Sequence, residues 1–151
     1  MTLGHRIDAL GGGVSSLVDR VPEADIATCL QLLAVTAVDV TDLSDDQMVR
    51  DVLSQWRQHG KPSRSARLHL ESMRHQAEHD GFAHRRRGDA DGHRASFLRA
   101  RALTCLAYGV DGQSSPRDAL REAAYEASIA VQGSGAVVAI LSDFVEASLR
   151  L

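Results

Sequence analysis

The chain of 151 residues is 44% apolar and 25% charged, an ordinary globular composition that suits one domain. Its formal net charge of −3 excludes a protein that is basic throughout, and its two cysteines, Cys29 and Cys105, exclude a disulfide-rich secreted framework. Only three prolines occur, whereas Ala and Leu, which enter helices at little cost, are abundant. We therefore predict an all-α fold, a single domain over residues 1–151 built as a bundle of about six to seven helices.

The first predicted element is an apolar stripe near the N-terminus. Its members recur at alternating intervals of four and three residues: Leu3, Ile7, Leu10, Val14, Leu17 and Val21. This spacing is typical of a helix face that meets a partner helix. Because the register persists across Gly11–Gly13, we favour one continuous helix over a helix that breaks at these glycines. The stripe then either completes the core or pairs with its copy in a homodimer.

The next two helices follow from apolar periodicity and from their end signals. Apolar residues occur on nearly all faces from Ile26 to Val40, so this helix should lie centrally. The segment Ser44–Gln47 has the pattern of a capping box that begins the third helix. Gly60 and the proline that soon follows it predict its end. Trp56, near that end, is either an interface anchor or a core residue.

The fourth and fifth helices enclose the charged middle of the chain. Ser63 is the expected cap of the fourth helix, which carries a thin apolar stripe. The segment His84–His93 is charged and contains two glycines, so it predicts either a loop or a frayed extension of the fourth helix. A fifth, mostly buried helix is expected from Phe97 to Val110, with Arg99 and Arg101 exposed.

The last two helices have clear boundaries. Ser115 at the cap and Pro116 in the first turn predict the start of an alanine-rich helix suited to close approach. Gly133–Gly135 separates it from a final amphipathic helix. We expect the second and fifth helices at the centre, with the last two packed against them through alanines.

Positive charge gathers between Arg57 and Arg101. Eleven Lys and Arg face five Asp and Glu there, a local balance of +6, whereas the rest of the chain has six against fifteen, or −9. Six of the seven histidines lie in the same stretch. Arginine presents a planar fork that pairs with carboxylates and phosphates. We therefore predict a partner-binding surface at Arg85, Arg86, Arg87 and Arg94.

The leading functional hypothesis is a non-enzymatic interaction protein (an adaptor, regulator or inhibitor) that docks an acidic protein partner. A homo-oligomer is also expected, because the positive stretch and the acidic remainder are complementary. Nucleic-acid binding through phosphates is the alternative, opposed by a pI of about 6.1 and few aromatic side chains. A solvated Arg-rich loop without any ligand explains the same residues. No signal peptide or membrane span is expected, which predicts a cytoplasmic protein.

A second alternative is a small metal protein or enzyme that uses the His75/His79 helix face. Glu71, His75 and His79 are spaced by four, and imidazole with carboxylate at that spacing can hold a divalent metal. Three such positions extend over about two turns, so one ion would need ligands from another helix. A solvated helix face is the simpler interpretation, and we predict no metal ligand.

No catalytic residue and no cofactor are predicted either. The glycine-rich segments Gly11–Gly13 and Gly133–Gly135 match no phosphate-binding fingerprint. Cys29 and Cys105 lie in apolar runs, where burial raises the pKa of a thiol and makes it inert.

Overall fold

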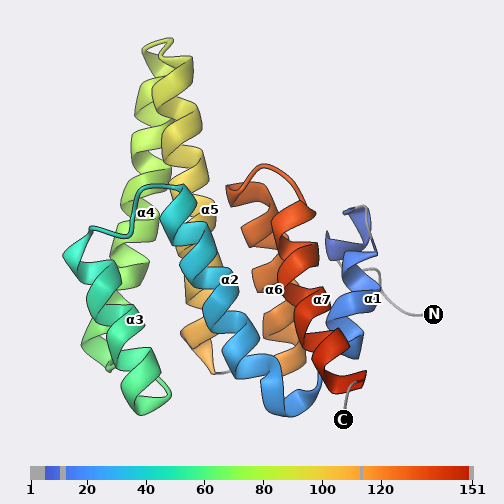
Figure 1. The fold of residues 1–151 in the computed structure, drawn as a ribbon. Coiled ribbons are helices and arrows are strands. Elements are labelled where there is room, and N and C mark those ends of the chain that lie inside the picture. Colours follow the sequence, from blue (N-terminus) through green and yellow to red (C-terminus); the bar gives the residue numbers. More distant parts are fainter. Residues whose placement is uncertain (1–5, 11–12, 113, 150–151) are drawn as a thin grey trace.

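The computed structural model describes residues 6–10, 13–112 and 114–149, and every regular element in these ranges is helical (Figure 1). Two short 3₁₀ helices, η1 (Arg6–Ala9) and η2 (Glu23–Asp25), accompany the α-helices. The α-helices are α1 (Val14–Arg20), α2 (Ile26–Val40), α3 (Gln47–His59), α4 (Arg64–Arg86), α5 (Ala90–Asp111), α6 (Pro116–Ala130) and α7 (Gly135–Leu149). The prediction of an all-α bundle is confirmed.

Helices α2, α5 and α6 pack on one another at the centre of the bundle, while α7 covers α1 and α2, and α3 packs against α4. Helix α6 brings small side chains to these contacts, all of them buried: Ala119, Ala123, Ala124, Ala127 and Ala130. Small side chains at a contact allow two helix axes to lie closer together. The expectation that α2 and α5 lie centrally holds, and α6 joins them there.

Trp56 packs between α3 and α5. Its side chain is 4% exposed, and its ring lies against Gly109, where a Cβ atom would come within 2.6 Å of the ring. The glycine therefore makes room for the indole inside the core. Of the two interpretations of Trp56, the core residue is the one that the structure supports.

The prediction of one continuous N-terminal helix is wrong. Helix α1 begins at Val14, and Gly13 before it has a φ of 73°, a left-handed conformation that glycine adopts without steric cost. Gly11 and Gly12 lie outside the described residues. Ile7, Val14 and Val21 are nevertheless buried, so the stripe completes the core of its own chain.

Two of the three predicted helix caps are confirmed. Ser63 and Ser115 accept hydrogen bonds from the backbone N–H groups three residues ahead, at 3.1 and 3.2 Å. The capping box at Ser44 is wrong, because Asp46 is the cap of α3 and accepts from the N–H groups of Met48 and Val49. Aspartate caps a helix as well as serine does, and two acids adjoin in this turn, so the sequence pattern alone does not choose the register.

Candidate functional site

Helices α4 and α5 form an antiparallel hairpin whose outer half projects beyond the other helices (Figure 1). Their 23 and 22 residues correspond to about 33 Å of helix each, at 1.5 Å per residue. Only Arg87, Gly88 and Asp89 separate the two helices. Of the two interpretations of His84–His93, the loop is wrong over most of the segment, because α4 extends to Arg86 and α5 begins at Ala90.

The turn at the tip of the hairpin explains the error. Gly88 has a φ of 72°, the left-handed conformation that reverses the chain. Asp89 caps α5 by accepting the N–H of Gly92 at 2.9 Å. Gly92 is helical, and a Cβ atom there would come within 2.5 Å of the His84 ring. One glycine makes the turn and the other allows close contact between the helices.

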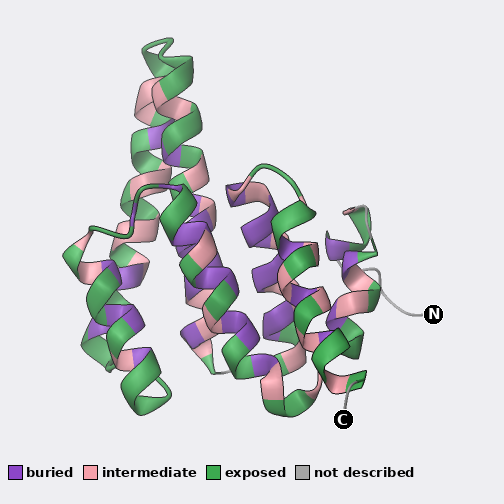
Figure 2. Cartoon of the chain, viewed as in Figure 1, coloured by how far each residue is buried: buried purple, intermediate pink, exposed green. Residues whose placement is uncertain are grey.

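Figure 2 shows that the tip of the hairpin is coloured as exposed. Arg85 and Arg86, in the last turn of α4, are both exposed, and neither has a hydrogen-bond or ion-pair partner in the described part of the chain. Arg87 follows as the cap residue and lies 3.1 Å from Nδ1 of His84. Cations at this end of a helix also complement its dipole. That effect does not require three arginines, and the run concentrates positive charge at the tip of the hairpin.

His84 and Asp89 pair across the turn, with 3.0 Å between Nδ1 and Oδ2. The Gly92 N–H and the His84 ring lower the pKa of Asp89. Nδ1 donates to Asp89 only when it carries a proton, and it accepts from Arg87 only when it does not. Nδ1 therefore serves one of these two neighbours at a time, according to the tautomer of the His84 ring.

Arg94 differs from the other three predicted residues in the contact that it makes. Its guanidinium donates to Oε1 of Gln132, in the turn between α6 and α7. The hydrogen bond ties the hairpin to the bundle at this point. The structure thus places Arg85, Arg86 and Arg87 together at the tip and gives Arg94 an intramolecular partner.

Sequence reasoning missed two exposed aromatic residues beside the arginines. Phe82 of α4 is 60% exposed and Phe97 of α5 is 45% exposed. Both line a groove of about 450 Å³ on one face of the hairpin, which also includes Arg85. Phe97 was expected within a mostly buried helix. The available signal was that two of the three phenylalanines, Phe82 and Phe97, fall inside the positive stretch between Arg57 and Arg101.

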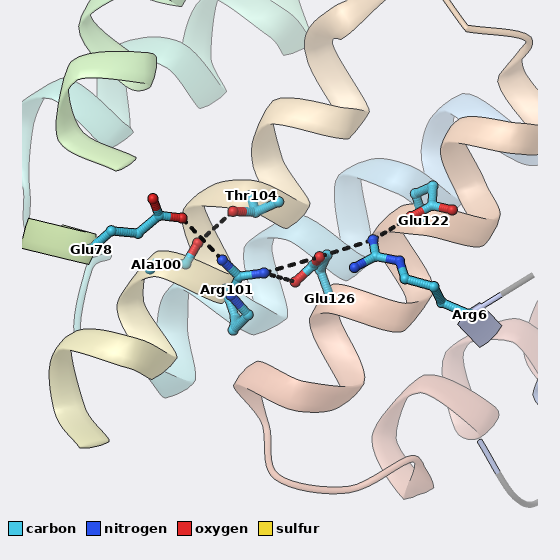
Figure 3. A network of polar contacts seen from close by, with 7 residues as sticks. All are labelled: Arg6, Glu78, Ala100, Arg101, Thr104, Glu122 and Glu126. Atoms are coloured by element: carbon cyan, nitrogen blue, oxygen red, sulfur yellow. Dashed lines mark hydrogen bonds and ion pairs between the residues drawn. The ribbon is translucent and has the colours of Figure 1, made fainter. Parts of the chain in front are cut away.

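A buried carboxylate lies where the hairpin joins the bundle (Figure 3). Glu126 of α6 is 1% exposed and accepts hydrogen bonds from Arg101 at 3.1 and 3.3 Å and from Arg6 at 3.1 Å. Arg101 also reaches Glu78 of α4 at 3.2 Å, and Arg6 pairs with Glu122. The network joins η1, α4, α5 and α6.

Charge pairing makes the burial of Glu126 possible, because an unpaired carboxylate in the core would be strongly destabilising. The expectation that Arg101 is exposed is wrong: its side chain is 20% exposed and its guanidinium also stacks 5.6 Å from the Phe97 ring centre. The hydrogen bond to Glu122 raises the pKa of Arg6 above its usual value, so Arg6 stays charged. Sequence reasoning gave no sign of this network.

The His75/His79 face is solvent-exposed on α4, and Glu71 pairs with Arg74 at 3.1 Å. Across residues 6–10, 13–112 and 114–149, no group of three or more His, Cys, Asp or Glu side chains is placed to hold a metal ion. Cys29 and Cys105 are buried free thiols, as expected. Burial raises the pKa of Cys29 to about 12 and raises that of Cys105 as well.

No single helix in the described ranges is long and apolar enough to cross a membrane; α1 and the segment Glu23–Val40 reach that length only together, and they are bent by 102° at their junction. Comparison with known proteins finds no matching family model, curated protein or solved structure.

Proposed function

We propose that this chain is a non-enzymatic interaction protein whose α4–α5 hairpin docks an acidic protein partner. The observation that carries the proposal is the projection of the hairpin beyond the bundle, with Arg85 and Arg86 free of partners in the described chain at its tip. Such charges are hydrated in the free protein and become paired when an acidic surface arrives.

The charge distribution supports the same proposal. A balance of +6 between Arg57 and Arg101 faces −9 in the rest of the chain, so an acidic partner is attracted to the hairpin and repelled elsewhere. Arrangements of this kind mainly increase the association rate and select the partner. The proposal covers an adaptor, a regulator or an inhibitor, because all three require only docking.

A protein partner is favoured over nucleic acid because two exposed phenylalanines accompany the free arginines. Apolar aromatic anchors in the centre and cations at the rim are the composition of protein interfaces. The two free cysteines suit a reducing compartment, so the proposed location is the cytoplasm.

The test compares captured proteins from a lysate of the source cells, quantified by mass spectrometry with and without nuclease. The bait is the full chain, or its triple variant Arg85→Glu, Arg86→Glu and Arg87→Glu. The matched control is Arg20→Glu, Arg50→Glu and Arg57→Glu, which makes the same change in charge at three exposed sites away from the tip. Circular dichroism verifies that all three proteins are folded.

We expect at least one acidic protein to be retained by the chain and by the control, and to fall by about tenfold with the tip variant at low salt. Equal retention by both variants would overturn the proposal. Loss of every tip-dependent protein after nuclease treatment would do so too, in favour of nucleic acid.

A further inference from the structure

The groove on the hairpin is lined by small residues that lie beside two large aromatic ones. Ala77, Gly81 and Ala100 lie along it, where the neighbouring positions carry Phe82 and Phe97. Gly81 is buried inside α4, and its carbonyl oxygen lies 2.9 Å from Nδ1 of His93 on α5. The hollow is thus part of a fixed contact between two helices.

Arg85 supplies the free charge of this groove. Two further charged residues line it, Glu78 and Arg101, and these pair with each other at 3.2 Å. Arg101 is also held by Glu126. Among the described lining residues, Arg85 is therefore the charge without an ion-pair partner. A ligand that complements the groove has an apolar anchor and a carboxylate near it.

We propose that the groove binds an acidic amphipathic helix of a protein partner, with apolar side chains against Phe82 and Phe97 and a carboxylate on Arg85. This inference rests on the proposed function and specifies the partner's chemistry. A third helix laid along a two-helix hairpin packs its ridges into the existing groove. It presents anchors at intervals of three and four residues.

An extended segment fits the same face less well. Peptides that bind as strands gain affinity from main-chain hydrogen bonds to an open sheet edge. Every regular element in the described ranges is helical, so no such edge is offered there. Along α4 and α5 the helical backbone groups are bonded within each helix, which leaves side-chain packing and charge to provide the affinity.

The test uses a displayed library of 16-residue peptides with helical sequence patterns, selected on the immobilised full chain. The enriched peptide is labelled with fluorescein, and its affinity is measured by anisotropy. The variants are Phe82→Ala, Phe97→Ala and Arg85→Gln. The matched control is Leu32→Ala on α2, since Leu32 is 45% exposed, as Phe97 is.

We expect enriched peptides to carry large apolar residues three or four positions apart with Asp or Glu between them. Either phenylalanine variant should weaken binding by about tenfold or more, as loss of an interface anchor does. Arg85→Gln should weaken it by about threefold at low salt and less at high salt. Leu32→Ala should leave the affinity unchanged.

Because Phe97 contacts Arg101, Phe97→Ala affects the fold as well as the groove. Amide chemical shifts of the ¹⁵N-labelled wild-type chain provide a measurement that needs no variant. Addition of the peptide should change the amide chemical shifts of residues 77–101. Shifts centred elsewhere, enrichment of basic peptides, or affinity unchanged in both phenylalanine variants would overturn the inference.

Two outcomes separate this inference from the proposed function. If captured proteins depend on Arg85–Arg87 but bind Phe82→Ala and Phe97→Ala as well as wild type, the hairpin docks a partner and the groove is not its site. If sedimentation shows a dimer that Phe97→Ala converts to a monomer, the groove holds a second copy instead of an acidic partner, which overturns the inference.

Discussion

Replacement of Glu126 by Gln should lower the free energy of unfolding by about 2–3 kcal/mol. The carboxylate accepts from Arg6 and Arg101 through Oε1, and from Arg101 at 3.1 Å through Oε2. The carbonyl oxygen of glutamine can keep the hydrogen bonds that Oε1 accepts from Arg6 and Arg101. The amide nitrogen, in the place of Oε2, would direct its N–H groups at the Arg101 guanidinium. A hydrogen bond to a charged group contributes about 1.5–3 kcal/mol. Removal of a whole buried partner costs about 3–5 kcal/mol, which sets the upper limit.

The matched control is Glu122→Gln in the same network. Glu122 is 28% exposed and its partner Arg6 is 46% exposed, so water screens the pair and the loss should stay below about 1 kcal/mol. Urea unfolding followed by circular dichroism at 222 nm measures both losses, and equal m-values verify that the same surface is exposed on unfolding. Equal destabilisation by the two variants would refute the argument that burial gives Glu126 its importance.

Two further predictions concern the bundle. Asp46→Ala should destabilise by about 1 kcal/mol while Ser44→Ala stays within about 0.5 kcal/mol, as measured by urea unfolding; the reverse order would restore Ser44 as the cap. Burial, reinforced by nearby Asp25, raises the pKa of Cys29 to about 12. An unfolded thiol ionises near pH 8.5, so this contribution to stability is complete below about pH 8.5 and is lost as the pH rises toward 12. Urea unfolding between pH 7.5 and 10 should show a decline that Cys29→Ala makes shallower, and an identical slope in that variant would contradict the assignment.

Local signals predicted much of the fold because they depend on a few neighbouring residues. Ser63 and Ser115 cap their helices through N–H groups three residues ahead, a relation visible in the sequence itself. The alanines of α6 similarly predicted a helix that packs closely against its neighbours. These features require no knowledge of which helix lies opposite.

The errors arose where a distant residue decides the local structure. Gly92 resembles a loop glycine until His84 is seen packed against it across the hairpin. Glu126 resembles a solvated acid until Arg6, 120 residues earlier, and Arg101 are seen beside it. In the candidate site, composition indicated the arginines, but the exposure of Phe82 and Phe97 depends on how far α4 and α5 extend beyond the bundle.

The base of the hairpin and the proposed groove share one residue, and this connects stability with binding. Arg101 lines the groove, stacks on Phe97 and holds Glu126. A carboxylate that entered the groove would meet Arg101 already neutralised by Glu78 and Glu126, whereas Arg85 remains free to receive it. In the proposed complex, the partner's carboxylate would therefore pair with Arg85 and not with Arg101. It also keeps α4 and α5 in register beneath the point where the partner would bind.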